Sequence, residues 1–190
     1  PAFTEMNDCT FGIIGKQDAD SRYYAHYVLQ EYAGVDNVGI IYIESDWGNA
    51  AMRNFVDEAG KIGLNIVEMA SFVQDEKDFS SIITKMKAAN PDHIAIMDQG
   101  ATSQIINQIR TSGWDVSLST NGPGTSQQLI DLCGENCEGL LLTTPFFFDP
   151  ENEKEMAWRD EFTERAGFAP TVHSVNAYDC ALLISEAIRQ

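Results

Sequence analysis

The chain has 190 residues, of which 44% are hydrophobic and 22% charged, as is ordinary for a globular chain with a substantial core. Twelve basic residues oppose 29 acidic ones, which gives a net charge of -17. The resulting field repels phosphate backbones and anionic lipid, so the composition argues against a nucleic-acid-binding protein.

The strand-like segments, all apolar or rich in β-branched residues, are expected at 10–15, 37–43, 64–73, 92–97, 116–120 and 138–144. The helical segments that alternate with them are expected at 21–34, 48–63, 78–90, 101–113 and 126–134. Two further helical patterns, around 151–166 and 174–189, follow with no strand between them. Repeated strand–helix alternation predicts an α/β fold, a doubly wound parallel sheet flanked by helices on both faces. We expect the chain to leave this sheet after Thr144.

The two ends of the chain suggest a longer protein. The first residue is Pro1 rather than Met, and the last residues, "LLISEAIRQ", stop within an amphipathic helical pattern. No secretion signal is recognisable, and no apolar stretch approaches the roughly 20 residues that a membrane span requires. We therefore expect this chain to be a fragment.

Two of the four cysteines, Cys133 and Cys137, lie close together in "CGENC", while Cys9 and Cys180 stand apart. A zinc site needs more ligands than this pair supplies. A local disulfide is the second alternative, if the protein is in an oxidising compartment. We favour the third alternative, two unpaired buried thiols.

Three loops follow strands of the predicted sheet, and ligands of open parallel sheets bind beyond the carboxyl ends of strands. These loops are "ESDWG" (44–48), "DQGAT" (98–102) and "NGPGT" (121–125). Each has small residues that let a ligand approach the backbone, and each opens a helix whose first amides attract anions. None carries the spaced glycines of a dinucleotide turn or the Gly-Lys-Ser/Thr of a phosphate loop.

The sequence offers little for catalysis. It contains neither the Gly-x-Ser-x-Gly of a nucleophile elbow nor the His-Glu-x-x-His of a zinc protease. His93 enters a buried strand, which favours a core imidazole over a catalytic one. Asp46 and Asp98 could act as an acid–base pair, but capping of the helices that follow them explains both residues.

Trp47 lies at a strand-to-helix turn, in a position that the helical period does not direct toward the core. Such rings often pave a ligand cleft, because a rigid apolar face loses little entropy on binding. The alternative is that the ring packs over the adjoining loop. We favour the cleft.

Several stretches, in this order, resemble the type I periplasmic-binding-protein family and, within it, the branched-chain amino acid receptors of ABC importers. They are "CTFGIIGKQDADSRYYAHYV", "VGIIYIESDWGNAAMRNFVDEAGKIGLNIV", "DEKDFSSIITKMKAANPDHIAI", "CEGLLLTTPFF" and "HSVNAYDCALLISEAI". The resemblance implies two lobes joined by three strands, with the ligand trapped between them. Residues 1–15 would then be a lobe-crossing segment and 16–143 the second, C-terminal ligand-binding lobe. Residues 144–190 would cross back and supply helices of the first lobe.

The resemblance also implies a function, that of a substrate-binding receptor of an ABC importer. It would capture a small polar ligand, an amino acid or a related compound, without enzymatic chemistry, metal or cofactor. Its partner would be a membrane permease, and its location the periplasm or, as a lipoprotein, the outer face of the membrane. A sensory or regulatory ligand-binding domain of the same fold is the alternative. A hydrolase or nucleotide-using enzyme is disfavoured by the missing motifs.

Individual residues follow from the resemblance and from the three loops. Trp47 matches the aromatic residue of the acidic turn that lines the cleft, and Gln99 falls near a tyrosine position. The glutamate that meets the ligand ammonium in relatives follows a Gly-Pro pair, but here Gly124 stands after Pro123. Either Asp46 or Asp98 would replace that carboxylate, or the ligand lacks an ammonium group. The candidate ligand-binding residues are Asp46, Trp47, Asp98, Gln99, Gly100, Asn121 and Gly122.

Overall fold

A computed structural model describes residues 11–15, 17–121 and 127–189. The chain divides into two compact units, which are described separately. One unit is residues 16–143, and the other combines residues 1–15 with 144–190. Among the described residues, no helix combines the length and apolar character that a bilayer crossing requires.

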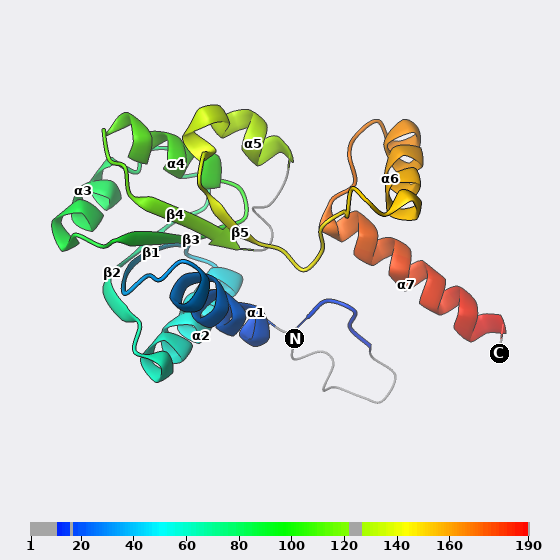
Figure 1. Cartoon of the computed structure of the whole chain (residues 1–190), viewed down its shortest axis with the longest axis horizontal. Helices are drawn as coiled ribbons and strands as arrows, with labels where there is room; N and C mark the ends of the chain where they lie inside the picture. The colour runs from blue at the N-terminus through cyan, green and yellow to red at the C-terminus, as the bar shows by residue number, and fades with distance from the viewer. Residues whose placement is uncertain (1–10, 16, 122–126, 190) are drawn as a thin grey trace. The chain divides into compact units, whose positions relative to one another are not determined.

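The unit formed by residues 16–143 is built on one sheet of five parallel strands, in the order β2-β1-β3-β4-β5 (Figure 1). The strands are β1 (Asn37–Ile43), β2 (Asn65–Phe72), β3 (His93–Met97), β4 (Ser117–Asn121) and β5 (Leu141–Thr143). All five residues of β3 are buried, because this strand is central and is covered on both faces.

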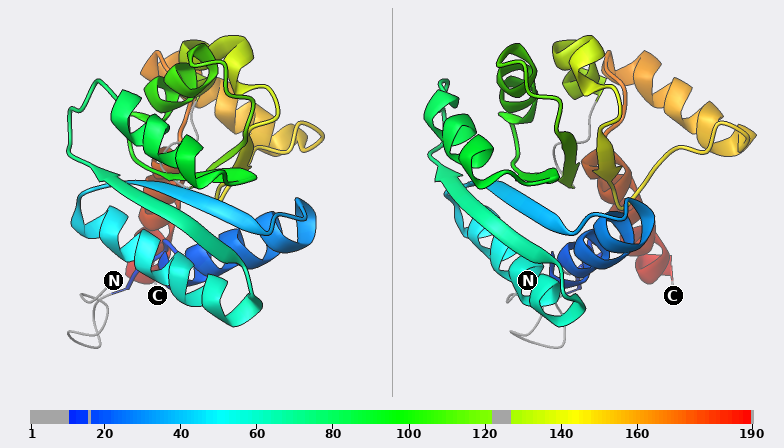
Figure 2. Two further views of the ribbon diagram at one scale, coloured as in Figure 1. Left: turned by 90° about the vertical axis from the view of Figure 1, so that its left-hand side faces the viewer. Right: turned by 60° about the vertical axis from the view of Figure 1, so that its left-hand side comes forward.

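Helices cover both faces of this sheet, as Figure 1 and Figure 2 show. One face carries α1 (Gln17–Tyr23), the π-helix η2 (Tyr24–Tyr32) and α2 (Asp46–Ile62). The other face carries α3 (Ser80–Ala89), α4 (Thr102–Thr111), α5 (Gln127–Cys133) and the short 3₁₀ helix η4 (Gly134–Cys137). The predicted doubly wound architecture is confirmed.

Two apolar cores hold these layers together, one on each face of the sheet. On the first face, Tyr24 of η2 and Phe55 of α2 are fully buried, with ring centroids 5.3 Å apart. On the second face, Phe79, Ile83 and Ile106 pack against the strands. Burial of side chains of this size is the main stabilising contribution to such a fold.

The strand order places a topological switch point between β1 and β3. The chain runs from β1 outward to β2 through α2 on one face. It then returns to β3 and continues through α4 and α5 on the other face. At such a point the connections after two adjacent strands diverge to opposite faces, which opens a crevice at the carboxyl ends of the strands.

The predicted strand at 37–43 is confirmed to the residue, and the other strands after it are confirmed with shifted ends. The apolar run at 10–15 was expected to be strand-like, and this is wrong for the described part, 11–15, which has no regular secondary structure. A strand needs a neighbour, and no strand of the described sheet pairs with this segment. Residue 10 lies outside the described residues.

In the other unit, helices α6 (Glu153–Ala166) and α7 (Val172–Arg189) are held by aromatic contacts. Trp158 is at the centre, with its ring centroid 6.0 Å from that of Phe148, 5.4 Å from Phe162 and 5.1 Å from Tyr178. Neither helix has a fully buried residue. Several aliphatic side chains of α7 are exposed, including Leu183 and Ile188.

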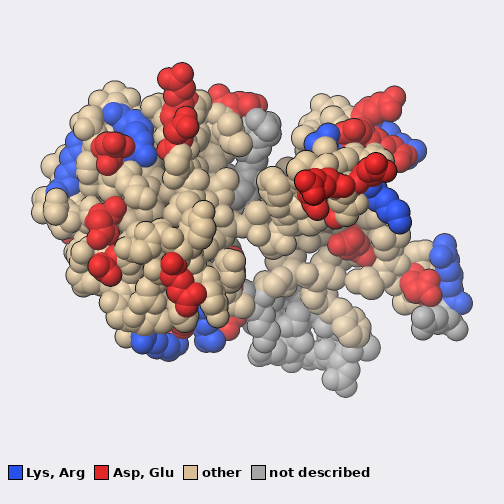
Figure 3. Space-filling model, viewed as in Figure 1, with Lys and Arg blue, Asp and Glu red and all other residues tan. Residues whose placement is uncertain are grey.

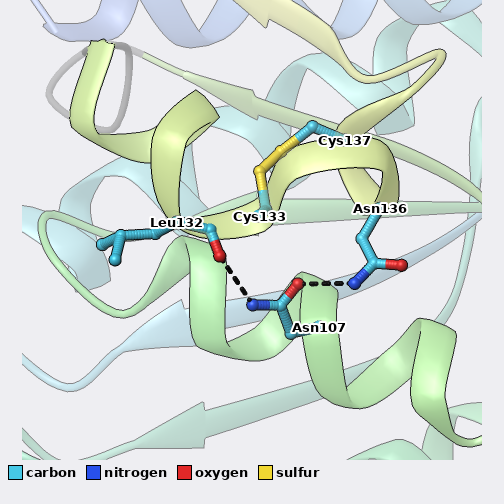
Figure 4. The surroundings of a disulfide bond; sticks show 5 residues. All are labelled: Asn107, Leu132, Cys133, Asn136 and Cys137. Carbon is cyan, nitrogen blue, oxygen red and sulfur yellow. Dashed lines mark hydrogen bonds between the residues drawn. A yellow bond between two sulfur atoms is a disulfide. The ribbon is translucent and has the colours of Figure 1, made fainter.

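The cysteine pair of "CGENC" forms a disulfide between Cys133 and Cys137, so the expectation of two free thiols is wrong (Figure 4). The 3₁₀ turn of η4 brings the two Cα atoms to 5.6 Å, within the usual range for a disulfide. Asn107 of α4 supports this corner. Its Nδ2 donates to the carbonyl of Leu132 at 3.0 Å, and its Oδ1 accepts from Asn136 at 2.8 Å.

Candidate functional site

The loops that follow β1 and β3 lie on either side of the switch point, at the carboxyl edge of the sheet. The first contains Asp46 and Trp47, and the second contains Asp98, Gln99 and Gly100. Five of the seven candidate residues therefore flank one crevice-forming position of the fold. Gly122 lies outside the described residues.

The loop after β1 is fixed by the start of α2. Ser45 is the N-cap of this helix, and its Oγ accepts from the amide of Gly48 at 3.0 Å. The expectation that Asp46 is the cap is therefore wrong, because the cap is one residue earlier and Asp46 begins the first helical turn. The side chain of Asp46 is exposed.

Trp47 is half-buried, and its ring packs against residues of both apolar cores. The indole therefore spans the edge of the sheet, where the two cores meet. This contact explains part of its position by packing. The residue is only half-buried, so part of its side chain is exposed to solvent.

Asp98 follows β3 and is 1% exposed, so its carboxylate is effectively inside the protein. Its Oδ2 accepts hydrogen bonds from the amides of Gly100, at 2.8 Å, and Ala101 and from the hydroxyl of Thr102, at 3.3 Å. The expectation that Asp98 caps the following helix is wrong, because the N-cap of α4 is Ala101, without a side-chain capping hydrogen bond, and Asp98 instead accepts from the amides of the turn before the helix. Its Oδ1 is buried without a hydrogen-bond partner.

Gln99 and Gly100, in contrast, are exposed at the tip of this loop. Asn121, at the end of β4, is fully buried, and its Nδ2 donates to Oδ2 of Asp20 at 3.2 Å. Asp20 was not a candidate from the sequence. Asp20 and Asn121 are 101 positions apart, so the local sequence gives no signal for this contact.

A buried polar chain runs below this edge, between β3, β4 and η2. Nδ1 of His93 lies 2.9 Å from Oγ of Ser117, and Nε2 lies 2.5 Å from Oγ of Ser119. The hydroxyls of Ser119 and Tyr24 share a further hydrogen bond. Burial lowers the pKa of His93 to about 4. The expected core imidazole is confirmed, since both ring nitrogens have partners and the residue is 0% exposed.

No group of three or more His, Cys, Asp or Glu side chains in the described part of the chain is arranged to hold a metal ion. On the face drawn in Figure 3, the basic side chains lie in small groups separated by acidic ones. The chemistry available at the carboxyl edge is therefore that of hydrogen bonding, one or more carboxylates and an aromatic face.

A hollow of about 610 Å³ lies in the other unit, between α6 and α7. Trp158 and Tyr178 form its apolar part. Its charged lining residues, Glu161 and Arg165, pair with each other at 2.6 Å, which leaves little charge to recognise a ligand.

The unit of residues 16–143 is an α/β domain of the open parallel-sheet class. A model of the periplasmic binding protein family matches residues 4–190, and the chain belongs to this family. The resemblance drawn from the sequence is confirmed at this level.

Two curated relatives illustrate the similarity. The Leu/Ile/Val/Thr-binding protein of Salmonella typhimurium is 28% identical over 126 residues, which are 66% of this chain and 34% of that protein. The Leu/Ile/Val-binding protein homolog 1 of Brucella suis is 22% identical over 194 residues, which cover 100% of this chain and 51% of that protein. The chain thus spans a third to a half of the length of these relatives.

Solved structures share the fold at lower identity. A putative branched-chain amino acid ABC transporter protein from Rhodospirillum rubrum has a TM-score of 0.82 at 19% identity, over 94% of this chain and 51% of that one. The branched-chain amino acid transporter substrate-binding protein of Streptococcus pneumoniae, in complex with isoleucine, has a TM-score of 0.79 at 21% identity. That match covers 90% of this chain and 49% of the other.

Proposed function

We propose that the protein is the solute-binding receptor of an ABC importer and that it captures an amino acid or a related small polar compound. The observation that carries this proposal is the position of the loops after β1 and β3, which lie on either side of the switch point. Family membership and the names of the relatives, which are amino-acid-binding proteins, support the same proposal.

We assign complementary roles to the edge residues. Trp47 would supply a rigid apolar surface, which binds with little loss of entropy. Gln99 and the backbone at Gly100 are exposed and would orient a polar end of the ligand. Asp46 and Asp98 remain candidates for contact with a positively charged group, and Gly122 for a backbone contact.

We infer that the protein binds its ligand without changing it chemically. The histidine–serine pair of His93 and Ser119 has the residue types of a nucleophile and its base. However, both side chains are fully buried in the core, where a substrate cannot reach them. We therefore propose a receptor rather than an enzyme. The mechanism is capture in the inter-lobe cleft that the resemblance implies, with closure about a hinge.

The partner and the location are part of this proposal. A membrane permease would receive the ligand from the closed receptor. The receptor would act in the periplasm or, as a lipoprotein, at the outer face of the membrane. An oxidising compartment is consistent with the disulfide between Cys133 and Cys137.

The test is a thermal-shift screen of the complete natural polypeptide against amino acids, small carboxylates, amides and sugars. A ligand at a hundred times its dissociation constant stabilises the protein by roughly 2.7 kcal/mol, which is a shift of several degrees. One responding chemical class supports the receptor. No response across the panel would overturn the importer proposal.

The responding ligand then tests the site through Trp47→Ala, which should weaken binding roughly tenfold or more. Trp114→Ala is the matched control. Trp114 is also a half-buried tryptophan that packs against the core, but it precedes β4 at the opposite edge of the sheet. Equal losses in both variants would mean that Trp47 acts through packing alone.

A further inference from the structure

Strand β2 forms one edge of the parallel sheet (Figure 2). It pairs with β1 on one side, and no described strand pairs with it on the other. The strand at the opposite edge, β5, has 3 residues, whereas β2 has 8. A long edge strand presents unpaired backbone groups to which another chain can add as a further strand. Of the two edges, the one along β2 is therefore the one that another strand could extend.

Met69 and Ser71 direct their backbone groups away from the sheet, along this β2 edge. The carbonyl of Phe72 accepts from the amide of Glu44, which directly follows β1, so Phe72 is directed toward β1. Backbone direction alternates along a strand, so Met69 and Ser71 face the other way. The extra residue of a bulge, Val67, interrupts the pattern before them.

Two side chains occupy both backbone groups of Met69. Oε1 of Glu68 accepts from the amide of Met69 at 2.8 Å, and Nζ of Lys85, on α3, donates to the carbonyl of Met69 at 3.2 Å. The same Oε1 lies 2.9 Å from Nζ of Lys85, which closes a ring of three contacts. We call Glu68 and Lys85 the edge clamp. It offers Met69 one acceptor and one donor, the two groups that a neighbouring strand would offer.

The edge clamp lies at the surface, where its side chains are 26% (Glu68) and 55% (Lys85) exposed. Ion pairs in such positions contribute little to stability, because solvent screens them. Hydrogen bonds from Lys85 and from the amide of Met69 lower the pKa of the Glu68 carboxyl group, so it is charged at neutral pH. Charged side chains at a sheet edge hinder the addition of another strand. Protection of the edge therefore explains the arrangement better than stability does.

A second copy of this chain fits the β2 edge. In an antiparallel pair with a two-fold axis at Ser71, the two Ser71 residues would exchange backbone hydrogen bonds, and Met69 of each copy would lie opposite Val73 of the other. Met69 and Val73 are 40% and 56% exposed, so the pairing would cover apolar side chains of both copies. It also needs the amide and carbonyl of Met69, which the edge clamp already uses.

We propose that the β2 edge is a pairing surface for a second copy of this chain and that the edge clamp holds it closed. The protein stays a single copy while Glu68 and Lys85 are both in place. This inference concerns self-association and goes beyond the proposed ligand-binding function.

The test is the mass of the complete natural polypeptide in solution, measured by sedimentation over a series of protein concentrations. The wild type should be monomeric. The double variant Glu68→Ala/Lys85→Ala should form a dimer, with a dissociation constant lower than that of the wild type by roughly tenfold or more. Lys85→Ala alone frees only the carbonyl of Met69 and should associate more weakly than the double variant.

Asp57→Ala/Lys61→Ala is the matched control. It removes another exposed acid–base pair, on α2, and leaves the net charge unchanged as the first double variant does. Because this pair does not touch the β2 edge, the control should stay monomeric.

Hydrogen exchange and a third substitution locate the contact. In the double variant of the edge clamp, the amide of Ser71 should exchange more slowly as the protein concentration rises, whereas in the wild type its rate should not change. Adding Ser71→Pro removes this amide. An edge strand tolerates proline where the missing amide faces solvent, so the triple variant should fold and be monomeric again.

Four results would overturn the inference and leave the receptor proposal standing. They are a double variant that stays monomeric, a wild type that already pairs through the β2 edge, equal association of the control, and a dimer in which Ser71 exchanges at the monomer's rate. The last two would mean that the copies meet elsewhere.

Discussion

Nε2 of His93 lies 2.5 Å from Oγ of Ser119, and both side chains are fully buried between the sheet and η2. Burial lowers the pKa of His93 to about 4, although the nearby Asp92 carboxylate acts in the opposite direction. In the unfolded chain the imidazole has its ordinary pKa of about 6.5. The unfolded state therefore binds a proton first, and stability is lost as the pH falls from about 6.5 toward 4.

The lowered pKa of His93 predicts a measurable difference between the wild type and a variant without this imidazole. Between pH 7.5 and pH 4.5 the wild type should lose roughly 2.5 kcal/mol more unfolding free energy than His93→Gln, which cannot take up this proton. Urea unfolding at both pH values measures the two losses. The carboxylates are common to both proteins and cancel in the comparison. Equal losses would show that the imidazole is not held neutral by the fold.

The ionisation of Asp20 changes the stability of the fold in the opposite direction from that of His93. Its pKa is raised by burial, with the hydrogen bond from Asn121 offsetting part of the rise. The folded state thus holds its proton more tightly than the unfolded state, and the group destabilises the fold once the pH exceeds both pKa values. Without added ligand, Asp20→Asn should melt at a higher temperature than the wild type at pH 7. The difference should vanish near pH 3, and a lower melting temperature at pH 7 would contradict it.

Gly48 marks a close approach of α2 to β1. A Cβ atom at this position would overlap the carbonyl oxygen and the side chain of Ile43. Gly48→Ala should therefore destabilise the protein by roughly 1–3 kcal/mol. Gly60→Ala, in the same helix, is the control. A Cβ there meets nothing within 4 Å, and alanine should stabilise by about 0.5–1 kcal/mol. Thermal unfolding of both variants, with opposite shifts expected, tests the contact.

The disulfide between Cys133 and Cys137 joins residues separated by 4 positions, so it closes a short loop. Loop-closure entropy for so few residues predicts a loss of about 2 kcal/mol on removal. A double Cys→Ser variant should show this loss in denaturant titrations. As a direct check, reduction before alkylation of the wild type should add two labelled cysteines. No increase in labelling would mean that the bond is absent.

Much of the fold could be predicted from local pattern. The strand at 37–43 is a continuous β-branched run, and Gly63 ends α2 in a left-handed conformation that glycine adopts without strain. Local pattern was less decisive at the start of α2, where Ser45 and Asp46 are both good capping residues. The disulfide depended on the turn of η4, which the spacing of the cysteines alone does not reveal.

The candidate site could be predicted only in part, for a physical reason. A loop after a parallel strand is recognisable from the strand itself, so Trp47 and Gln99 were found at the carboxyl edge. The contact between Asp20 and Asn121 depends on which strand lies beside which helix. The strand order decides that, and no single segment of the sequence encodes it.

The strand order also bears on how quickly the chain folds. β1 pairs with both β2 and β3, and the second pairing brings together Asn37 and Asp92, which are 55 residues apart. β4 and β5 then add in sequence order. Among the strand pairings, this one closes the longest loop and so costs the most entropy before any contact repays it, which makes the β1–β3 pairing the natural bottleneck in forming the sheet. Weakened packing in β1 should therefore slow folding, whereas weakened packing in β5 should mainly speed unfolding.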